Sequence, residues 1–455
     1  MRPSVTHAPR RRLGSVQLAA CAAWTLSGND IGTMITAAPR LYPHMWSWDT
    51  AFISIGLAHL NVDRAVQELE TLLAAQWRNG MLPHIVFSEG GGYFPGPQRW
   101  GAAELNADAP DAPRTSGICQ PPVHAIALRR IVDTGRLGSQ SDVDAVERLL
   151  REGWPRLYHW HEWLVRHRDP HATGLLAIVH GWESGMDNSP RWDVPYSAVV
   201  PGPDLPPYVR LDRGLVSHAD AERPSDREYD RYLWLIEEMR KVRYDADQVV
   251  RTSSFLVGDV FVTALFALAS EVLATLGEES GQPAWQIKQL RGWARRSRAA
   301  VAAAYDPVSG LARDRDLRTD EWLSTRTIAG FAPLLCGGLP EADEQRLLET
   351  ICGPDWAGHP DLFAAIPPSV SPNDPGFRPR EYWRGPVWPV IAWLFGWAFE
   401  HRGWPKHAAQ LRTECLRLVE DGSFAEYYNP MTGEPLGSKQ QSWTATVVLD
   451  WLHTA

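Results

Sequence analysis

Apolar residues recur at helical spacing along most of the chain. One example runs through Trp404, Ala408, Leu411, Cys415 and Leu418, whose intervals of four, three, four and three residues place a single apolar stripe along a helix. Such a stripe predicts a helix that packs one face against a core and leaves the other face in water.

A second pattern predicts helices that are packed on all sides. The segment Phe255 to Leu276 is apolar on nearly every face, as expected of a helix surrounded by others. Asn61 precedes another helical stretch as its N-cap. After an N-terminal helix, the pattern predicts few and short strands and twelve helical stretches, at 49–59, 62–77, 121–134, 142–168, 227–240, 253–277, 283–304, 322–336, 340–352, 385–400, 404–420 and 441–453.

Three similar turns separate these helices at 169–174, 306–310 and 429–433. In each, an Asp or Asn side chain caps the turn, Pro fixes φ and Gly takes a left-handed position. Because turns of one kind recur at long intervals, we expect helix pairs arranged around a common axis. Six such pairs predict an all-α fold, an (α/α)6 barrel or toroid, formed by residues 1–455 as a single domain.

Three connections rich in Pro and Gly, at 83–119, 194–226 and 354–380, are longer than simple helix–helix links. They are either linkers between domains or active-site loops. We favour active-site loops, because the residues beside them carry the candidate chemistry.

The charge and hydropathy of the chain predict a water-soluble protein. Its net charge of −9 gives no support to a nucleic-acid or anionic-membrane partner. The most apolar stretch, Val260 to Ser270, has Asp259 and Glu271 at its ends and falls short of the roughly 18 residues of a membrane span. We therefore expect no transmembrane segment.

Five cysteines, an odd number with no C-x-x-C pair, argue against a disulfide framework and a zinc site. They fit a reducing cytoplasm, where we expect the protein to reside. The basic cluster at 10–12 and the apolar run after it imitate a signal peptide. Gln17 interrupts that run and no clear cleavage site follows, so we expect a first amphipathic helix instead.

The 22 tryptophans are an unusually large number. Most of them are expected to fill the core. An indole also offers a flat apolar face to the C–H side of a sugar ring, and we assign about a quarter of the tryptophans to a ligand cleft.

The first candidate motif, at 181–193, holds three carboxylates and two tryptophans in a loop-like segment. Glycoside hydrolysis needs one protonated carboxylic acid beside the departing oxygen and a second carboxylate that activates water. A carboxyl group among indoles is desolvated, which raises its pKa towards the value an acid catalyst needs. The alternative is a tight turn whose carboxylates cap helices and pair with Arg191.

The second motif, at 422–443, places Glu426 among aromatic residues. The alternation from Phe424 to Tyr428 predicts a short strand that points Glu426 away from Ala425 and Tyr427. Glu426 is then a candidate base, with a salt-bridged surface glutamate as the alternative.

The third and fourth motifs, at 42–49 and 380–389, are rich in aromatic residues and precede predicted helices. Asp49 is either the N-terminal cap of its helix or a hydrogen-bond acceptor for sugar hydroxyls while Trp46 or Trp48 stacks on the ring. No phosphate-binding loop, H-E-x-x-H, nucleophile elbow or Cys/His ligand set occurs, so we expect no cofactor and no metal.

Together and in this order, the four motifs resemble glycoside hydrolase family 63, and most closely its bacterial branch that hydrolyses mannosylglycerate and glucosylglycerate. The residues that carry the resemblance are the Trp-Asp pair at 48–49, the W-E-S-G-x-D-N-S segment at 182–189 and the E-Y-Y segment at 426–428. The resemblance spans almost the whole chain.

The resemblance implies an (α/α)6 barrel, inversion at the anomeric carbon, Asp187 as general acid and Glu426 as general base. It implies a pocket for the glycosyl unit lined by Tyr42, Trp46, Trp48, Asp49, Trp383, Trp388 and Gln441. From the same motifs we add Trp182 and Tyr382 to the substrate-binding residues.

In small-substrate members of that branch a loop closes over the glycerate, and here 194–226 occupies that place; 83–119 is the second expected substrate-covering loop. An anionic aglycone needs a cation, and an arginine grips a carboxylate with two hydrogen bonds. We choose Arg223, with Tyr229 near it, and keep Arg213 as the alternative. Tyr93, from the other loop, is a further candidate.

Other hypotheses remain beside hydrolysis of glucosylglycerate or mannosylglycerate. The partner in each is a small-molecule glycoside, and a homo-oligomer is one option for assembly. One hypothesis is a different specificity in the same family, such as an α-glucosidase acting on short oligosaccharides or a trehalase-like activity. A non-catalytic sugar-binding protein would keep the tryptophans without needing both Asp187 and Glu426. A helical-toroid sugar epimerase would need paired histidines, and no evident pair is formed by His44, His84, His180 and His218.

Overall fold

Six helices form a closed inner ring in the computed structural model, which describes residues 12–454 apart from 91 and 217. Each inner helix packs against the next, and the last packs against the first. In ring order these helices are α2 (Ser47–Ala58), α6 (His124–Gly135), α12 (Val260–Glu279), α14 (Ala332–Cys336), α16 (Pro389–His401) and α18 (Ser442–His453).

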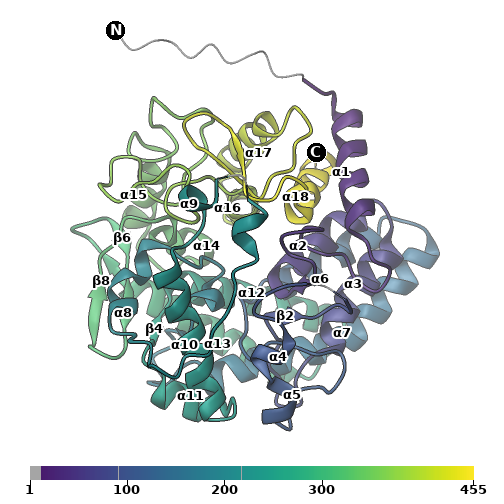
Figure 1. Cartoon of the computed structure of the whole chain (residues 1–455). Coiled ribbons are helices and arrows are strands. Elements are labelled where there is room, and N and C mark those ends of the chain that lie inside the picture. Colours follow the sequence, from purple (N-terminus) through teal and green to yellow (C-terminus); the bar gives the residue numbers. More distant parts are fainter. Residues whose placement is uncertain (1–11, 91, 217, 455) are drawn as a thin grey trace.

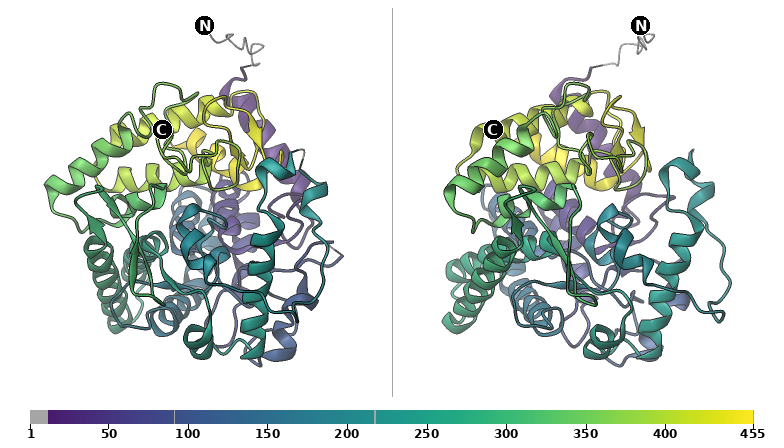
Figure 2. Two further views of the ribbon diagram at one scale, coloured as in Figure 1. Left: turned by 60° about the vertical axis from the view of Figure 1, so that its left-hand side comes forward. Right: turned by 90° about the vertical axis from the view of Figure 1, so that its left-hand side faces the viewer.

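Each inner helix packs against a partner helix of an outer ring, and several also contact a second outer helix. The outer helices, in the same ring order, are α3 (Val62–Ala74), α7 (Gln140–His167), α13 (Ala284–Ala303), α15 (Glu341–Cys352), α17 (Pro405–Leu418) and α1 (Ser15–Asn29). Because α1 pairs with α18, elements from the two ends of the chain lie side by side (Figures 1 and 2). The predicted (α/α)6 barrel is confirmed.

The burial of the helices follows their hydrophobic patterns. Every residue of α2 is buried, and α12 and α16 are buried on nearly all faces. The outer helix α7 buries one stripe and exposes polar residues on its other face. The inner ring is therefore the core, and the outer ring shields it from water.

Shorter elements lie in the connections between the ring helices. The helices among them are α4 (Pro97–Trp100), α5 (Ala102–Leu105), α8 (Asp193–Ser197), α9 (Ala219–Glu222), α10 (Asp226–Lys241) and α11 (Ala246–Thr252), with 3-10 turns η1 (Gly181–Ser184), η2 (Pro190–Trp192), η3 (Asp212–Gly214) and η4 (Ile328–Phe331).

Ten short strands, all paired antiparallel, complete the fold within the described residues. One sheet has the order β3 (Ala177–Ile178), β4 (Val257–Gly258), β7 (Asp314–Asp316) and β8 (Glu321–Leu323). The remaining strands form the pairs β1 (Met45–Trp46) with β2 (Ile85–Val86), β5 (Tyr305–Asp306) with β6 (Leu311–Ala312), and β9 (Tyr427–Tyr428) with β10 (Pro435–Leu436).

Local signals in the sequence were reliable guides to the caps and turns. The Asn61 side chain accepts a hydrogen bond from the Arg64 backbone N–H at 2.9 Å, as an N-cap does. The three predicted turns have their glycines at φ 87°, 70° and 69°, at Gly174, Gly310 and Gly433. All five cysteines are free.

Two predicted helices begin later than expected. The stretch 253–277 opens with β4, and α12 starts only after Asp259, whose carboxylate accepts hydrogen bonds from the Phe261 and Val262 backbone N–H groups. The stretch 322–336 opens with β8, in which Trp322 pairs with Arg315 of β7. Short apolar runs fit a strand as well as a helix, so their period alone did not separate the two.

The helix α12 is also longer than the apolar run seen in the sequence. It continues past Glu271 to Glu279, and an 18-residue window within it has a mean hydropathy of 1.9. Length and composition alone would let it cross a membrane, yet 78% of that window is buried inside the protein, as in the core helix of a globular fold.

Two buried arginines hold the segment between η1 and η2 through ion pairs. Before its turn, Arg168 Nη2 donates to Glu183 Oε1 at 2.8 Å. After the turn, Arg191 donates to Asp314 at 2.6 and 2.7 Å and to Asp259 at 2.6 Å. Arg191 therefore does not pair with the carboxylates of its own motif, as the turn hypothesis supposed, but ties the motif to β7 and to the start of α12.

Replacement of Arg191 by Met is expected to destabilise the fold by about 3–5 kcal/mol, because two buried carboxylates would lose their counter-ion. The free energy of unfolding, from the denaturant midpoint, measures the effect. Arg213→Met is the control, since Arg213 pairs with exposed Asp220 and Asp226 and its loss should leave the midpoint unchanged. Equal midpoints for the two variants would contradict the role of Arg191.

Candidate active site

A pocket with about 670 Å³ of empty space, its open mouth included, lies where the chain leads into the inner helices. Its lining comes from the segments before α2, α6, α16 and α18 and from the connection between α7 and α12. The lining residues are Tyr42, Trp46, Trp48, Asp49, His84, Tyr93, Gln120, Trp182, Gly185, Asp187, Arg223, Pro224, Tyr229, Tyr382, Glu426, Gln441 and Trp443.

Asp187 lies in the turn that follows η1, and Gly185 of the same turn packs against the indole of Trp48. The turn needs Gly185 at φ +70°, where a Cβ atom would come within 2.7 Å of the Trp48 ring. Burial raises the pKa of Asp187 to about 7, although the positive charge of Arg223 opposes this shift. At neutral pH a large share of Asp187 is therefore protonated.

Glu426 lies directly before β9 and is held by three hydrogen-bond donors. The Tyr42 and Tyr382 hydroxyls donate to Oε1 at 2.8 and 2.9 Å, and the Ser438 backbone N–H donates to Oε2 at 3.2 Å. Burial raises the pKa of Glu426, whereas Arg223 and these donors lower it. The donors stabilise the carboxylate form.

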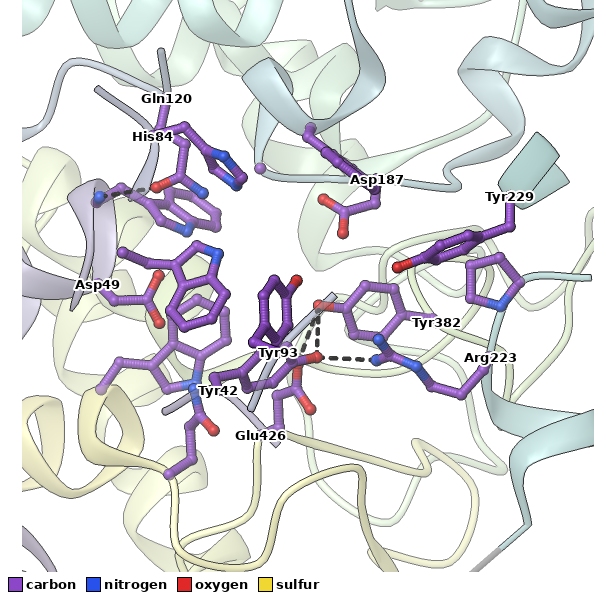
Figure 3. A pocket seen from close by; sticks show the side chains of 17 residues that line it. Tyr42, Asp49, His84, Tyr93, Gln120, Asp187, Arg223, Tyr229, Tyr382 and Glu426 are labelled. Atoms are coloured by element: carbon purple, nitrogen blue, oxygen red, sulfur yellow. Dashed lines mark hydrogen bonds between the residues drawn. The ribbon is translucent and has the colours of Figure 1, made fainter. Parts of the chain in front are cut away.

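The two carboxyl groups thus differ in their surroundings. Figure 3 shows Asp187 and Glu426 on opposite sides of the pocket. Glu426 has three donors from other residues, while the described part of the chain supplies no side-chain donor to Asp187. This arrangement suits one proton donor and one proton acceptor on either side of a bound molecule.

Asp49 lies at one end of the pocket, in the first turn of α2. The N-cap of that helix is Trp46, so Asp49 does not cap it and its side chain lines the pocket instead. Burial, together with the charges of Glu426 and Asp187, raises the pKa of Asp49 well above its usual value. Gln441 also lines the pocket, and its buried Oε1 has no hydrogen-bond partner among the described residues, so it is free to accept from a ligand.

Arg223 and Tyr229 lie at the other end of the pocket, as Figure 3 shows. The Arg223 guanidinium packs over the Tyr382 ring at 4.7 Å and donates from Nε to Asp212 Oδ2 at 3.2 Å. Arg213, the alternative cation, is outside the pocket lining and pairs with Asp220 and Asp226. The structure therefore favours Arg223 as the cation of the site.

Most of the predicted site residues meet in this pocket, but Trp383 and Trp388 do not line it. Their rings stack on each other at 3.7 Å, and Trp388 packs against Tyr382 and Tyr427. They form a layer behind the lining residues, so the structure does not bring them together with the other predicted residues of the pocket. Tryptophan-rich motifs do not tell which indoles face a pocket and which support it.

The loop 354–380, predicted to serve the active site, also contributes no lining residue. Its backbone bonds to other segments, with Phe363 donating to Pro430 and Ser369 to Pro386. It thus supports the segments that carry the aromatic residues. The loops 83–119 and 194–226 do reach the pocket, through Tyr93 and Arg223.

Five lining residues were not predicted: His84, Gln120, Gly185, Pro224 and Trp443. Four of them lie in motifs or loops already singled out, and Gln120 sits just before a predicted helix. Gln120 Oε1 accepts a hydrogen bond from the Trp48 backbone N–H at 3.1 Å. A lone polar residue in a loop carries no spacing signal, so only its position before a ring helix could have pointed to it.

Comparison with known proteins adds to this geometry. The model of the mannosylglycerate hydrolase MGH1-like glycoside hydrolase domain matches residues 42–444. A glucosylglycerate hydrolase of Mycolicibacterium hassiacum is 57% identical over 96% of this chain and 98% of its own. A mannosylglycerate hydrolase of Thermus thermophilus is 39% identical over 94% of this chain and 98% of its own.

Solved structures agree with these matches. A family 63 mannosylglycerate hydrolase of Thermus thermophilus, in complex with Tris and D-glycerate, superposes with a TM-score of 0.86 at 38% identity, covering 95% of this chain and 99% of that one. A neutral trehalase of Saccharomyces cerevisiae has a TM-score of 0.54 at 13% identity, over 92% of this chain and 73% of its own, which shows a shared fold.

Proposed function

Because the chain belongs to the mannosylglycerate hydrolase MGH1-like glycoside hydrolases of family 63, we propose that it cleaves the α-glycosidic bond of glucosylglycerate to glucose and glycerate with inversion. Mannosylglycerate is the second substrate of the proposal, since several relatives bear that name. The observation that carries the mechanism is the unequal environment of the two carboxyl groups.

In the proposed reaction, Asp187 is the general acid and Glu426 the general base. Asp187, whose burial raises its pKa to about 7, protonates the glycosidic oxygen as the bond to glycerate breaks. Glu426 takes a proton from water, and the oxygen of that water bonds to the anomeric carbon from the opposite face. The two tyrosine hydroxyls that donate to Glu426 keep its carboxylate aimed into the pocket.

We assign the two ends of the pocket to the two halves of the substrate. Asp49, Gln120 and Gln441 offer acceptors and donors to sugar hydroxyls, and Trp48 offers a ring face. Arg223, with Tyr229 beside it, would hold the glycerate carboxylate, since a guanidinium matches that anion with two hydrogen bonds. Tyr93 and the loops 83–119 and 194–226 would cover the bound substrate.

The proposal extends to the domain organisation of the chain and to its location in the cell. Closure of the inner ring between α18 and α2 supports residues 1–455 acting as a single catalytic domain. The five free cysteines support a location in the cytoplasm, where thiols stay reduced.

A panel of glycosides tests the proposed substrate and stereochemistry. We expect glucosylglycerate to be hydrolysed with a higher kcat/KM than mannosylglycerate, kojibiose or trehalose. Rapid proton NMR should show β-glucose as the first product of the α-linked substrate. Binding without turnover across the panel would point to a sugar-binding protein, and α-glucose as first product would refute inversion.

Removal of either carboxyl group should lower kcat by a factor of about 10²–10⁴, the usual contribution of general acid–base catalysis. In the unmodified protein, kcat/KM should fall as the pH rises through about 7, because Asp187 loses the proton that the reaction needs. Asp187→Asn should lose this basic limb, while Glu426→Gln should keep it. Near-normal turnover in either variant, with circular dichroism showing an intact fold, would remove that residue from its role.

Replacement of Arg223 by Gln should raise KM for glucosylglycerate by about 10–100-fold, the loss of a hydrogen bond to a charged group. The KM for glucosylglycerol, which lacks the carboxylate, should rise far less in the same assay. Arg213→Gln, on the same loop but outside the pocket lining, is the matched control and should leave the KM for both substrates unchanged. An equal rise in KM for both substrates would show that Arg223 does not recognise the anion.

A further inference from the structure

A line of hydrogen bonds crosses the pocket from Arg223 to Glu426. Arg223 Nη1 donates to the Tyr42 hydroxyl at 2.8 Å, and this hydroxyl donates to Glu426 Oε1 at 2.8 Å. Figure 3 shows the three side chains joined in this way, with Tyr42 between the cation and the carboxylate. Tyr42 thus links Arg223, which is proposed to hold the leaving group, to Glu426, the proposed base.

The Arg223 guanidinium is fixed so that one edge remains for a ligand. Nε is bonded to Asp212, which two donors of Arg210 also hold at 2.6 and 3.0 Å, and Nη1 is bonded to Tyr42. Within residues 12–454, gaps at 91 and 217 aside, Nη2 has no hydrogen-bond acceptor. A carboxylate that binds the edge formed by Nη1 and Nη2 would neutralise the cation without breaking its link to Tyr42.

We propose that Tyr42 couples the charge of the leaving group to the basicity of Glu426. The proposal rests on the proposed function, because it takes Arg223 as the site of the substrate carboxylate. In the free enzyme the guanidinium polarises the Tyr42 hydroxyl and favours the carboxylate form of Glu426. A bound carboxylate cancels that charge, so Glu426 holds a proton more strongly and becomes a better base towards water.

The other groups around Glu426 do not supply this response. Burial raises the pKa of both Asp49 and Asp187, and neither forms a hydrogen bond with Arg223, so neither responds to the leaving group in this way. Tyr382 and Tyr427 surround the carboxyl group, and Tyr382 donates to the same oxygen as Tyr42. Of the influences that lower the pKa of Glu426, the charge of Arg223 is the largest. An anionic substrate would therefore neutralise the group that lowers this pKa most.

The coupling would make the enzyme selective at the chemical step as well as in binding. An anionic aglycone strengthens the base at the moment when the bond to that aglycone is to be broken. A neutral aglycone of the same shape leaves Arg223 charged and Glu426 a weaker base. Discrimination between the two would therefore appear in kcat and not in KM alone.

The pH dependence of the two kinetic parameters tests the proposal. The acid limb of kcat/KM reports Glu426 in the free enzyme, and that of kcat reports it in the complex. With glucosylglycerate, the limb of kcat should lie about one pH unit above that of kcat/KM, at the low end of the effect of a neighbouring opposite charge. With neutral glucosylglycerol the two limbs should coincide.

Three variants test whether Tyr42 carries the coupling. Tyr42→Phe removes the link, so the separation between the limbs should shrink to less than half of its original value. Tyr382→Phe removes a donor to the same Glu426 oxygen but keeps the ring under Arg223, so both limbs should move to higher pH with their separation retained. Arg213→Gln, which alters an exposed ion pair of the same loop, should change neither limb.

The outcomes separate this inference from the proposed function. If the wild-type protein hydrolyses glucosylglycerate but its two limbs coincide, the coupling is absent. An undiminished separation in Tyr42→Phe would show that Tyr42 does not carry it. Should a variant turn over too slowly, carbon-13 NMR titration of the Glu426 carboxyl, with and without saturating D-glycerate, measures the same shift without catalysis. Failure of the wild-type protein to hydrolyse glucosylglycerate would overturn the proposed function instead.

Discussion

The geometry of the pocket depends on the buried guanidinium of Arg191. It neutralises Asp314 of β7 and Asp259 at the start of α12, so three segments that are distant in sequence are fixed by one side chain. A second buried pair, between Arg168 and Glu183, holds the other side of the same loop. Asp187 stands between these two anchors, which leaves its turn little freedom to move away from Trp48.

Because the pocket is rigid and buried, its two carboxyl groups can differ in protonation at the same pH. Exposed to water, they would have nearly the same pKa. Asp187 and Glu426 each carry a carboxyl group in the same buried pocket, and the charge of Glu426 disfavours the ionisation of Asp187. The protein resolves the conflict by giving hydrogen-bond donors to Glu426, whereas Asp187 is buried without a side-chain donor from the described residues. The two roles of acid and base follow from the surroundings of the groups, since their chemical nature is nearly identical.

Much of this arrangement was predictable from sequence, and the failures have a common cause. The periodicity of the ring helices is strong because each helix has a defined buried face, so the barrel and most of its helices were found. The family resemblance carried by the motifs predicted Asp187 and Glu426 in one pocket, and the covering loop of that family led to the choice of Arg223. Periodicity could not show that 322–336 begins as a strand, and composition could not show that Trp383 and Trp388 stand behind the lining. Both depend on contacts with residues distant in the chain, such as Arg315 for Trp322 and Tyr427 for Trp388.

The closure of the ring also affects how the protein reaches its active form. The hydrogen bond between Tyr42 and Glu426 joins residues 384 positions apart, and α2 meets α18 only when the ring is complete. Contacts of such long range form late in folding, because the entropy of closing the intervening chain must be overcome first. A partly folded chain with its early helices in place would therefore still lack the base. The appearance of activity during refolding would report the last step of assembly, the joining of the two ends of the barrel.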